Sequence, residues 1–135
     1  MAAGQNFAAQ YRQTGVSSAV LEADPHRLIA LLLAGANERI RLADACLSRG
    51  DIARKARAIS EACAIIAGLN SSLDHAAGGE IASNLEALYD YSQRRLVEAN
   101  LHNDPERLHE VAGLLGEIES AWSAIAPAAR NIEAR

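Results

Sequence analysis

Four stretches of the sequence, residues 25–48, 52–73, 80–101 and 105–125, place apolar or small side chains at alternating intervals of three and four residues. This spacing returns one stripe of side chains to the same face of an α-helix over its whole length. The pattern therefore predicts four amphipathic helices. The stripe residues are Ile29, Leu33, Ala36, Ile40, Ala43 and Leu47; Ile52, Ala56, Ile59, Cys63, Ile66, Asn70 and Leu73; Ala82, Leu85, Tyr89, Ser92, Leu96 and Ala99; and Leu108, Val111, Leu115, Ile118, Trp122 and Ile125.

The ends of these helices are marked by residues that start or stop a helix. Asp24-Pro25 and Asp104-Pro105 each offer a carboxylate that caps free amides and a proline suited to the first helical position. Gly50-Asp51 can end the first helix and start the second, and another helix is expected to start after Gly78-Gly79. Short connections between helices of similar length favour antiparallel neighbours. We expect an all-α fold, an antiparallel up-down-up-down four-helix bundle.

The rest of the chain extends this bundle at both ends. A chain of 135 residues has the size of about one domain. Residues 1–23 carry no strong apolar period and are expected to form an N-terminal arm or short helix. We expect the bundle to occupy residues 24–126 and a flexible C-terminal tail to occupy residues 127–135. Half of the residues are apolar but only 4% are aromatic, which favours close helix packing over a β-sandwich.

Composition and charge exclude several kinds of partner. The net charge is −4 and the basic residues are scattered, so no basic excess is available for nucleic acid. The densest basic cluster, Arg54-Lys55-Arg57, is interpreted as a solvated helix face. No apolar run approaches the ~18 residues of a membrane span, and residues 1–10 lack the pattern of a secretory signal. We expect a cytoplasmic protein that does not insert into a membrane.

The two cysteines are expected to be reduced, small, buried side chains. In a hairpin that closes near Gly50, Cys46 would lie level with about residue 54, and Cys63 roughly 13 Å further along by helical rise. Bridged Cα atoms are rarely more than ~7 Å apart. We therefore expect no disulfide between them.

No group of residues in the sequence indicates catalysis or metal binding. A di-iron bundle needs two Glu-x-x-His motifs on separate helices, but this sequence has a single one, Glu106 to His109, beside the predicted stripe. His26 and His75 are expected at one end of the bundle and His102 at the other. Phosphate-binding loops, nucleophile elbows and dinucleotide fingerprints are absent. We expect no catalytic residue, no metal and no cofactor, and a protein that binds another protein rather than an enzyme.

The first predicted helix is more apolar than one stripe requires. Leu28, Leu31 and Leu32 lie beside its stripe, and its apolar arc spans roughly 200°. An ordinary surface helix needs little more than about 100°. Either this helix is the most buried of the four, or part of its apolar face is a docking surface, for which Leu28 and Leu32 are the candidates.

Several blocks of residues, spread over roughly residues 11–125, form one combined pattern. They are Tyr11, Val16, Ala23-Asp24-Pro25-His26-Arg27-Leu28-Ile29, Gly35-Ala36, Leu69-Asn70-Ser71-Ser72-Leu73-Asp74, Gly78-Gly79-Glu80-Ile81-Ala82, Asn84-Leu85-Glu86-Ala87-Leu88-Tyr89-Asp90-Tyr91, Arg95-Leu96, Ala99-Asn100, Asp104 and Glu119-Ser120-Ala121-Trp122. Taken together, these blocks resemble one known family, that of the flagellar secretion chaperone FliS, and the Gly-Gly-Glu-Ile…Asn-Leu…Leu-Tyr block is fairly specific. Where that family commonly has Leu-Tyr-Asp-Gly-Ala in the first helix, this chain has Leu32-Leu33-Ala34-Gly35-Ala36.

The resemblance implies a four-helix bundle that binds the C-terminal segment of flagellin, prevents its premature polymerisation and assists its delivery to a component of the flagellar type III export apparatus. It also implies that the N-terminal arm lies over apolar surface until the partner displaces it. A disordered segment can wrap a large surface with moderate, reversible affinity. Weak self-association of the free protein is a further expectation. The alternative is a helical-bundle adaptor or chaperone for a different secreted protein.

The resemblance also suggests residues that bind the partner. Tyr11 matches in the arm, and Tyr89, on the predicted stripe, is open to two interpretations, core packing or partner contact. Leu88 and Tyr91 lie off that stripe, where apolar side chains are better candidates for an interface, although Leu88 could also join a wide core. The residues of α-helical segment 80–101 that we expect to bind the partner are Asn84, Leu88, Tyr89, Tyr91, Arg95 and Asn100.

Overall fold

A computed structural model describes residues 24–125 of the chain as four α-helices. They are α2 (Pro25–Ser48), α3 (Ile52–Ser71), α4 (His75–His102) and α5 (Pro105–Ala124), and residues 24–125 contain no strand. The predicted all-α fold is confirmed. The predicted arm, with Tyr11, and the predicted tail lie outside the described residues.

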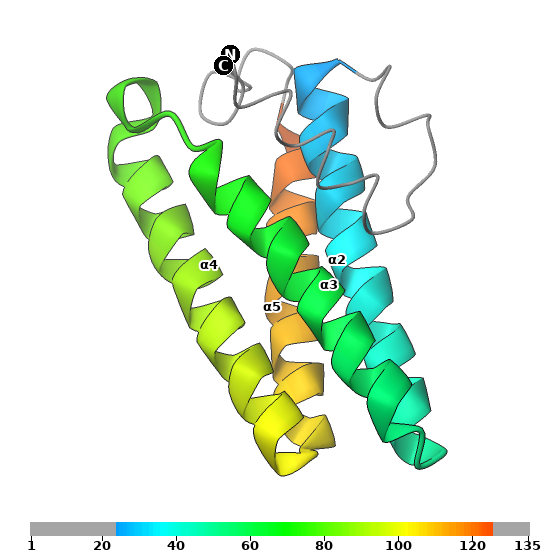
Figure 1. Cartoon of the computed structure of the whole chain (residues 1–135). Helices are drawn as coiled ribbons and strands as arrows, with labels where there is room; N and C mark the ends of the chain where they lie inside the picture. The colour runs from blue at the N-terminus through cyan, green and yellow to red at the C-terminus, as the bar shows by residue number, and fades with distance from the viewer. Residues whose placement is uncertain (1–23, 126–135) are drawn as a thin grey trace.

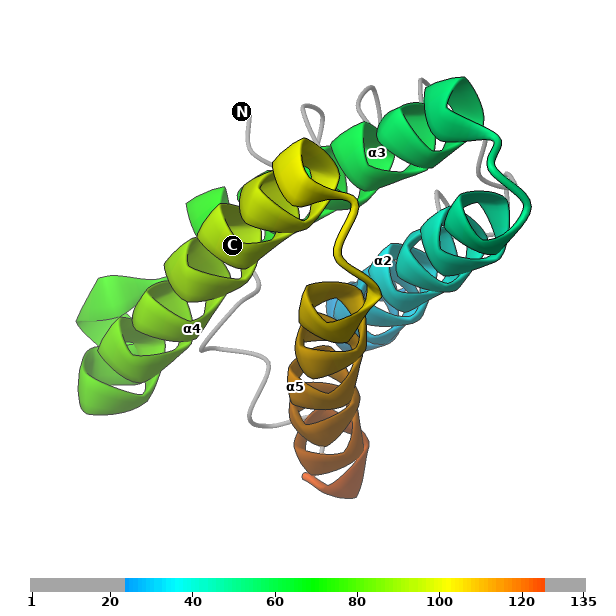
Figure 2. The same ribbon diagram turned by 90° about the horizontal axis from the view of Figure 1, so that it is seen from below.

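The four helices form a ring in which each packs against two others. α2 and α4 each lie beside both α3 and α5, while the backbones of α2 and α4, and those of α3 and α5, do not approach each other closely. Consecutive helices run in opposite directions and are joined by the short connections 49–51, 72–74 and 103–104 (Figure 1). Seen from below, the helices follow one another around the bundle in chain order (Figure 2). This is the predicted up-down-up-down topology.

Aspartate side chains begin all four helices. Oδ1 of Asp24 accepts a hydrogen bond from the Arg27 amide at 2.8 Å, and Asp51 and Asp104 cap α3 and α5 in the same way. Such a side chain satisfies an amide that has no partner inside the helix. Gly50 has a φ of +76°, the left-handed conformation expected of a glycine that ends a helix.

The start of α4 differs from the prediction. The Gly78-Gly79 pair predicts a start near residue 80, but Asp74 caps an earlier turn that begins at His75, and Oδ1 of Asp74 accepts from the Ala77 amide at 3.2 Å. The helical path then breaks at Gly79, with φ +54° and ψ −122°. Only glycine adopts this conformation readily, so the pair marks a kink between one turn and the main helix.

The core lies inside the ring and consists mostly of predicted stripe residues. The stripe residues of α2, α4 and α5 are largely buried, but Ile125 is 39% exposed. In α3 the buried side is rotated away from the predicted stripe. Ile52, predicted in the stripe, is 45% exposed, and Lys55, predicted on a solvated face, is 2% exposed. The buried residues of α3 are Lys55, Ala58, Ile59, Ala62, Ile65, Ile66, Gly68 and Leu69.

Trp122 and His26 close one end of the bundle. Their rings stack with centroids 4.6 Å apart, and Nε1 of Trp122 donates to the main-chain oxygen of His26 at 2.8 Å. The buried indole N–H is thus satisfied, and the last turns of α5 are tied to the first turn of α2. None of the four described helices is both long enough and apolar enough to span a membrane.

Candidate partner-binding surface

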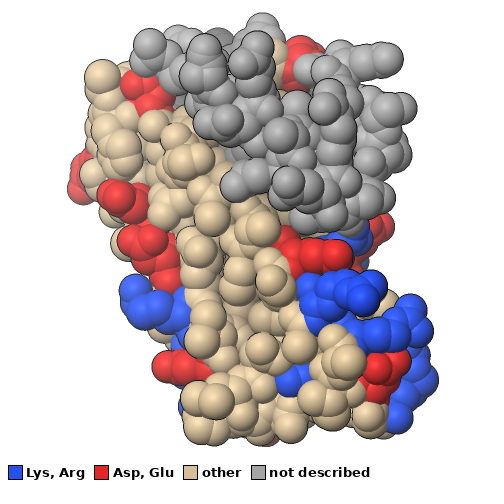
Figure 3. Space-filling view, in the orientation of Figure 1, with Lys and Arg blue, Asp and Glu red and all other residues tan. Residues whose placement is uncertain are grey.

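One face of the bundle, formed by α3 and α4, has an uncharged band of side chains running along its length (Figure 3). The hydrogen bond from Nδ2 of Asn70 to Oδ1 of Asp90, at 2.9 Å, shows which edges of the two helices meet there. Cys63, Ala56 and Ile52 lie seven, fourteen and eighteen residues before Asn70, and Val97 and Leu101 lie seven and eleven residues after Asp90. They share the same two edges because these spacings are close to whole helical turns, and Ala67 lies beside them, about one turn from Asn70. We call this surface the α3–α4 face and define it by Ile52, Ala56, Cys63, Ala67, Val97 and Leu101.

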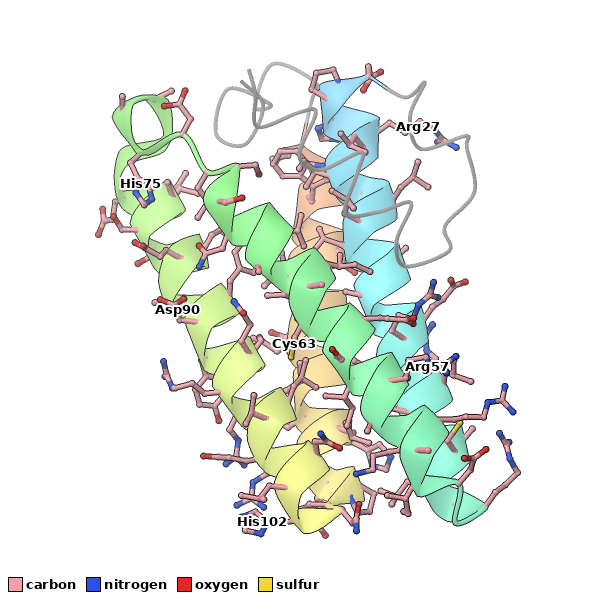
Figure 4. All side chains as sticks on the ribbon, in the orientation of Figure 1. Arg27, Arg57, Cys63, His75, Asp90 and His102 are labelled. Carbon is pink, nitrogen blue, oxygen red and sulfur yellow. The ribbon has the colours of Figure 1, made fainter. Side chains whose placement is uncertain are left out.

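The α3 part of this face consists of short side chains. Cys63 projects from the side of α3 that faces α4 (Figure 4). Most exposed or half-buried positions of α3 carry short side chains; the long charged ones are Arg54, Arg57 and Glu61, of which Glu61 pairs with Arg39 of α2. Because the distance between packed helices depends on the side chains at the contact, the short side chains allow another helix to approach closely. They are Ala53, Ala56, Ser60, Cys63, Ala64, Ala67 and Ser71.

The α4 part of the face exposes large apolar side chains. Val97 is 59% exposed and Leu101 is 74% exposed, and Ile52 across the junction with α3 is 45% exposed. A shallow, open hollow of about 360 Å³ is lined by Val97, Gln93, Arg94 and Glu98. Clustered exposed apolar residues rimmed by polar ones are typical of a surface that binds another protein.

Burial affects the chemistry of Cys63, in the middle of the face. The side chain is half-buried, and desolvation raises the pKa of its thiol to about 11. The thiolate is the nucleophilic form, so Cys63 is a slow nucleophile near neutral pH. Cys46 is fully buried, and both cysteines are free thiols.

Four of the predicted residues, Asn84, Leu88, Tyr91 and Arg95, lie in a line on the opposite edge of α4. Their spacing of four, three and four residues keeps them on one side of the helix. Asn84 is exposed and Leu88 is half-buried. The structure therefore brings these four together, but on the side of α4 that faces α5.

Tyr91 and Arg95 are engaged within the chain. The Tyr91 hydroxyl donates a hydrogen bond to Oε2 of Glu110, and Nε of Arg95 donates to Oε1 of Glu110 at 2.8 Å. The hydrogen bond to Glu110 raises the pKa of Tyr91 above its usual value. The same bond from Tyr91, followed by that from Arg95, lowers the pKa of Glu110. These contacts link α4 to α5 at the surface.

The other predicted residues of α4 have roles inside the bundle. Tyr89 is 0% exposed and belongs to the core, in agreement with one of its two interpretations. Asn100 accepts hydrogen bonds from the buried ammonium group of Lys55. Neither side chain is placed on the α3–α4 face.

The two candidates in α2 differ in burial. Leu32 is 2% exposed within the core, and Leu28 is half-buried against it. α2 has more buried residues than any other described helix, which favours the interpretation that its wide apolar arc reflects deep burial.

The α3–α4 face was not predicted from the sequence. Val97 and Leu101 are an apolar pair at an interval of four residues, outside the stripe of α4. This pair was the signal in the sequence, because two large apolar side chains on a face away from the core indicate a second contact surface. The exposure of Ile52 gave no such signal, since its spacing fits the predicted stripe of α3.

Comparisons with known proteins agree with the resemblance described above. Residues 7–129 match the family model described as "Flagellar protein FliS". The chain is 48% identical over 126 residues to the flagellar secretion chaperone FliS of Salmonella typhimurium, covering 93% of each chain. It is 46% identical over 116 residues to the flagellar secretion chaperone FliSB of Pseudomonas aeruginosa, covering 86% of this chain and 92% of the relative. Against FliS of Bacillus subtilis the identity is 36% over 118 residues, with coverage of 87% and 84%.

Proposed function

Because this chain belongs to the FliS family of flagellar secretion chaperones, we propose that it is a cytoplasmic export chaperone for flagellin. It binds the C-terminal segment of flagellin, keeps that segment from polymerising early and assists its delivery to the flagellar type III export apparatus. The main structural support for this proposal is that Val97 and Leu101 are exposed to solvent beside the short side chains of α3. An amphipathic helix that covers these residues removes apolar surface from water on both partners.

The flagellin segment wraps around α4 and contacts both of its edges. Its apolar side chains cover the α3–α4 face, and its path continues to the edge that carries Asn84, Leu88, Tyr91 and Arg95. Leu28 extends the contact onto α2, and the arm that carries Tyr11 competes with the segment for this surface. Tyr89, Asn100 and Leu32 support the surface from inside, since each is buried or bonded within the bundle.

The proposed role is binding, without catalysis. In residues 24–125 no three His, Cys, Asp or Glu side chains lie together in a group that could hold a metal ion. His109 of the one Glu-x-x-His motif contacts Asp44, with 2.9 Å between Nε2 and Oδ2. The exposed apolar residues also give the free protein a weak tendency to self-associate, and the flagellin segment suppresses it by covering the same atoms.

The reactivity of Cys63 tests where the segment binds. The full chain is treated with a maleimide at pH 8, alone, with the flagellin C-terminal segment, and with a segment of equal length from the middle of flagellin. Saturation with the C-terminal segment should slow the modification of Cys63 at least tenfold, and the central segment should not. Cys46 is 0% exposed, so its rate reports any unfolding.

Two other results would contradict parts of the proposal. If calorimetry shows no binding of the C-terminal segment to the full chain, the flagellin function is wrong. If the segment binds and Cys63 reacts at the unbound rate, the α3–α4 face is not its site.

A further inference from the structure

The charges beside the α3–α4 face are separated along its length. Residues 75–90 of α4 contain Glu80, Glu86 and Asp90 but no lysine or arginine. Towards the other end of the face, Arg57 on α3 and Arg94 on α4 lie at its two borders. Glu98 lines the same hollow as Arg94, but its carboxylate pairs with Arg95 and Arg107. In Figure 3 acidic residues border the upper part of the uncharged band, whereas lower down basic residues gather beside it together with some acidic ones, and Figure 4 labels Asp90 and Arg57 on opposite sides of the band.

The acidic side chains of this border have no strong cationic partner among residues 24–125. Oε1 of Glu86 lies 3.8 Å from Nε2 of His75, which is charged only if protonated. Oδ1 of Asp90 accepts from the neutral amide of Asn70. Both carboxylates are therefore able to interact with a cation supplied from outside the bundle.

The basic side chains are similarly uncompensated in the described part of the chain. Arg57 makes no ion pair there, and Arg94 lies 6.0 Å from the centroid of the Tyr91 ring. Other charged residues nearby are paired within the bundle: Nε of Arg39 lies 2.9 Å from Oε1 of Glu61. The bordering charges thus form an acidic pair, Glu86 and Asp90, and a basic pair, Arg57 and Arg94.

We propose that these two pairs fix the direction in which a partner helix lies on the α3–α4 face. The N-terminal end of the helix lies beside Glu86 and Asp90, and its C-terminal end lies beside Arg57 and Arg94. The bound helix therefore runs in the same direction as α4. This inference rests on the proposed function and specifies its ligand, an amphipathic helix of the flagellin segment with basic residues near its start and acidic residues near its end.

Electrostatics favours this direction for two reasons that act together. A helix carries a partial positive charge at its N-terminus and a partial negative charge at its C-terminus, and both ends then meet opposite charges. The reverse direction places like charges together, and their repulsion makes that orientation less stable. Because the four side chains are at the surface, the preference should weaken as salt is added.

Spin labels at two points along the face measure the direction. Ser83 and Leu101 are exposed, lie on the same edge of α4 and are separated by about 27 Å of helical rise. A nitroxide is attached in full-length Ser83→Cys/Cys63→Ser and Leu101→Cys/Cys63→Ser proteins, and the amide signals of isotope-labelled flagellin C-terminal segment are recorded. The label at Ser83→Cys should broaden the amide signals from the N-terminal end of one bound helix. The label at Leu101→Cys should broaden the amide signals from its C-terminal end.

Charge variants test the cause of the direction. Glu86→Gln/Asp90→Asn should weaken binding of the flagellin segment about threefold to tenfold at low salt, the range expected for two exposed ion pairs. The control, Glu106→Gln/Glu117→Gln, removes the same charge from exposed positions of α5 and should change the affinity less than twofold.

The possible results separate this inference from the proposed function. If the Ser83→Cys label broadens signals from the C-terminal end of the bound helix and the Leu101→Cys label those from its N-terminal end, the assigned direction is wrong, although flagellin binding is still supported. The direction also fails if neither label broadens a bound segment, or if the α4 variant and its control bind equally. A segment that does not bind the unmodified chain at all contradicts the flagellin function itself.

Discussion

The ammonium nitrogen of Lys55, near the start of α3, lies 2.6 Å from Oδ1 and 3.0 Å from the main-chain oxygen of Asn100, near the end of α4. Lys55 is 2% exposed, so this contact holds a buried positive charge with two oxygens of one residue. The main-chain oxygen belongs to the last turn of α4, where no amide further along the helix can reach it. The contact thus caps α4 and joins it to α3.

Removing the Asn100 side chain should cost stability, because it deprives a buried ammonium of one of its acceptors. Asn100→Ala should lower the free energy of unfolding by about 2 kcal/mol, measured by urea denaturation. Asn84→Ala, which alters an exposed asparagine of the same helix, should change it by less than about 0.5 kcal/mol. Equal effects of the two changes would show that the Lys55 contact contributes little.

A charge introduced into the core stripe of α5 should be far more damaging than a change at its surface. Ile118 is partly buried against the core, and Ile118→Asp should destabilise the fold by several kcal/mol, because the aspartate has no partner there. Glu106→Gln, at an exposed position, should leave the melting temperature almost unchanged. If Glu106→Gln proved as damaging, this carboxylate would have a structural role.

The pKa of Tyr91 should fall towards its ordinary value in Glu110→Gln, since the hydrogen bond to the Glu110 carboxylate is the main cause of its raised pKa. NMR titration of ring-labelled tyrosine, assigned with Tyr91→Phe, measures the shift. A Tyr91 pKa that is unchanged in Glu110→Gln would mean that the bond does not persist in solution.

The same contact makes a pH-dependent contribution to stability. The pKa of Glu110 is lowered in the folded protein, so its contribution is present above the ordinary glutamate range and is lost as the pH falls through the folded value. Tyr91 has a raised pKa, so its contribution is present below the ordinary tyrosine value and is lost at higher pH. The difference in melting temperature between the unmodified protein and Glu110→Gln should therefore shrink in acid.

Removing the exposed apolar pair of α4 should weaken flagellin binding and leave the fold intact. Val97 and Leu101 are 59% and 74% exposed, so Val97→Ser/Leu101→Ser sacrifices little core packing. Calorimetry with the flagellin C-terminal segment should show a loss of about 2 kcal/mol in binding free energy. Unchanged affinity would remove the α3–α4 face from the binding site.

Deleting residues 1–16, which lie outside the described part of the chain, should leave the bundle folded, because residues 24–125 contribute core side chains from all four helices. If the arm competes with the partner, the deletion should tighten binding of the flagellin segment by about 1 kcal/mol, the scale of one partly buried aromatic side chain. It should also favour self-association. Tenfold weaker binding after the deletion would instead make the arm part of the binding site.

Much of the fold was determined by the sequence alone. The alternating spacing of stripe residues defines helices because it matches the helical turn, and Asp24, Asp51 and Asp104 cap helices wherever they precede them. Short connections then leave few ways to arrange four helices. For the binding surface, the sequence suggested nine candidate residues, and the structure places four of them, Asn84, Leu88, Tyr91 and Arg95, along one side of α4. The nine are Tyr11, Leu28, Leu32, Asn84, Leu88, Tyr89, Tyr91, Arg95 and Asn100.

The tertiary structure decided which edge of each helix is covered, and by which neighbour. Periodicity specifies one face of a helix, but the positions of its two neighbours decide which edges of that face are covered, and α3 buries Lys55 and leaves Ile52 exposed. For the same reason Asn100 became a partner of Lys55, and Arg95 a partner of Glu110. Such pairings depend on the relative height and rotation of two helices, which are set by the packing of the whole core and not by the spacing within either helix.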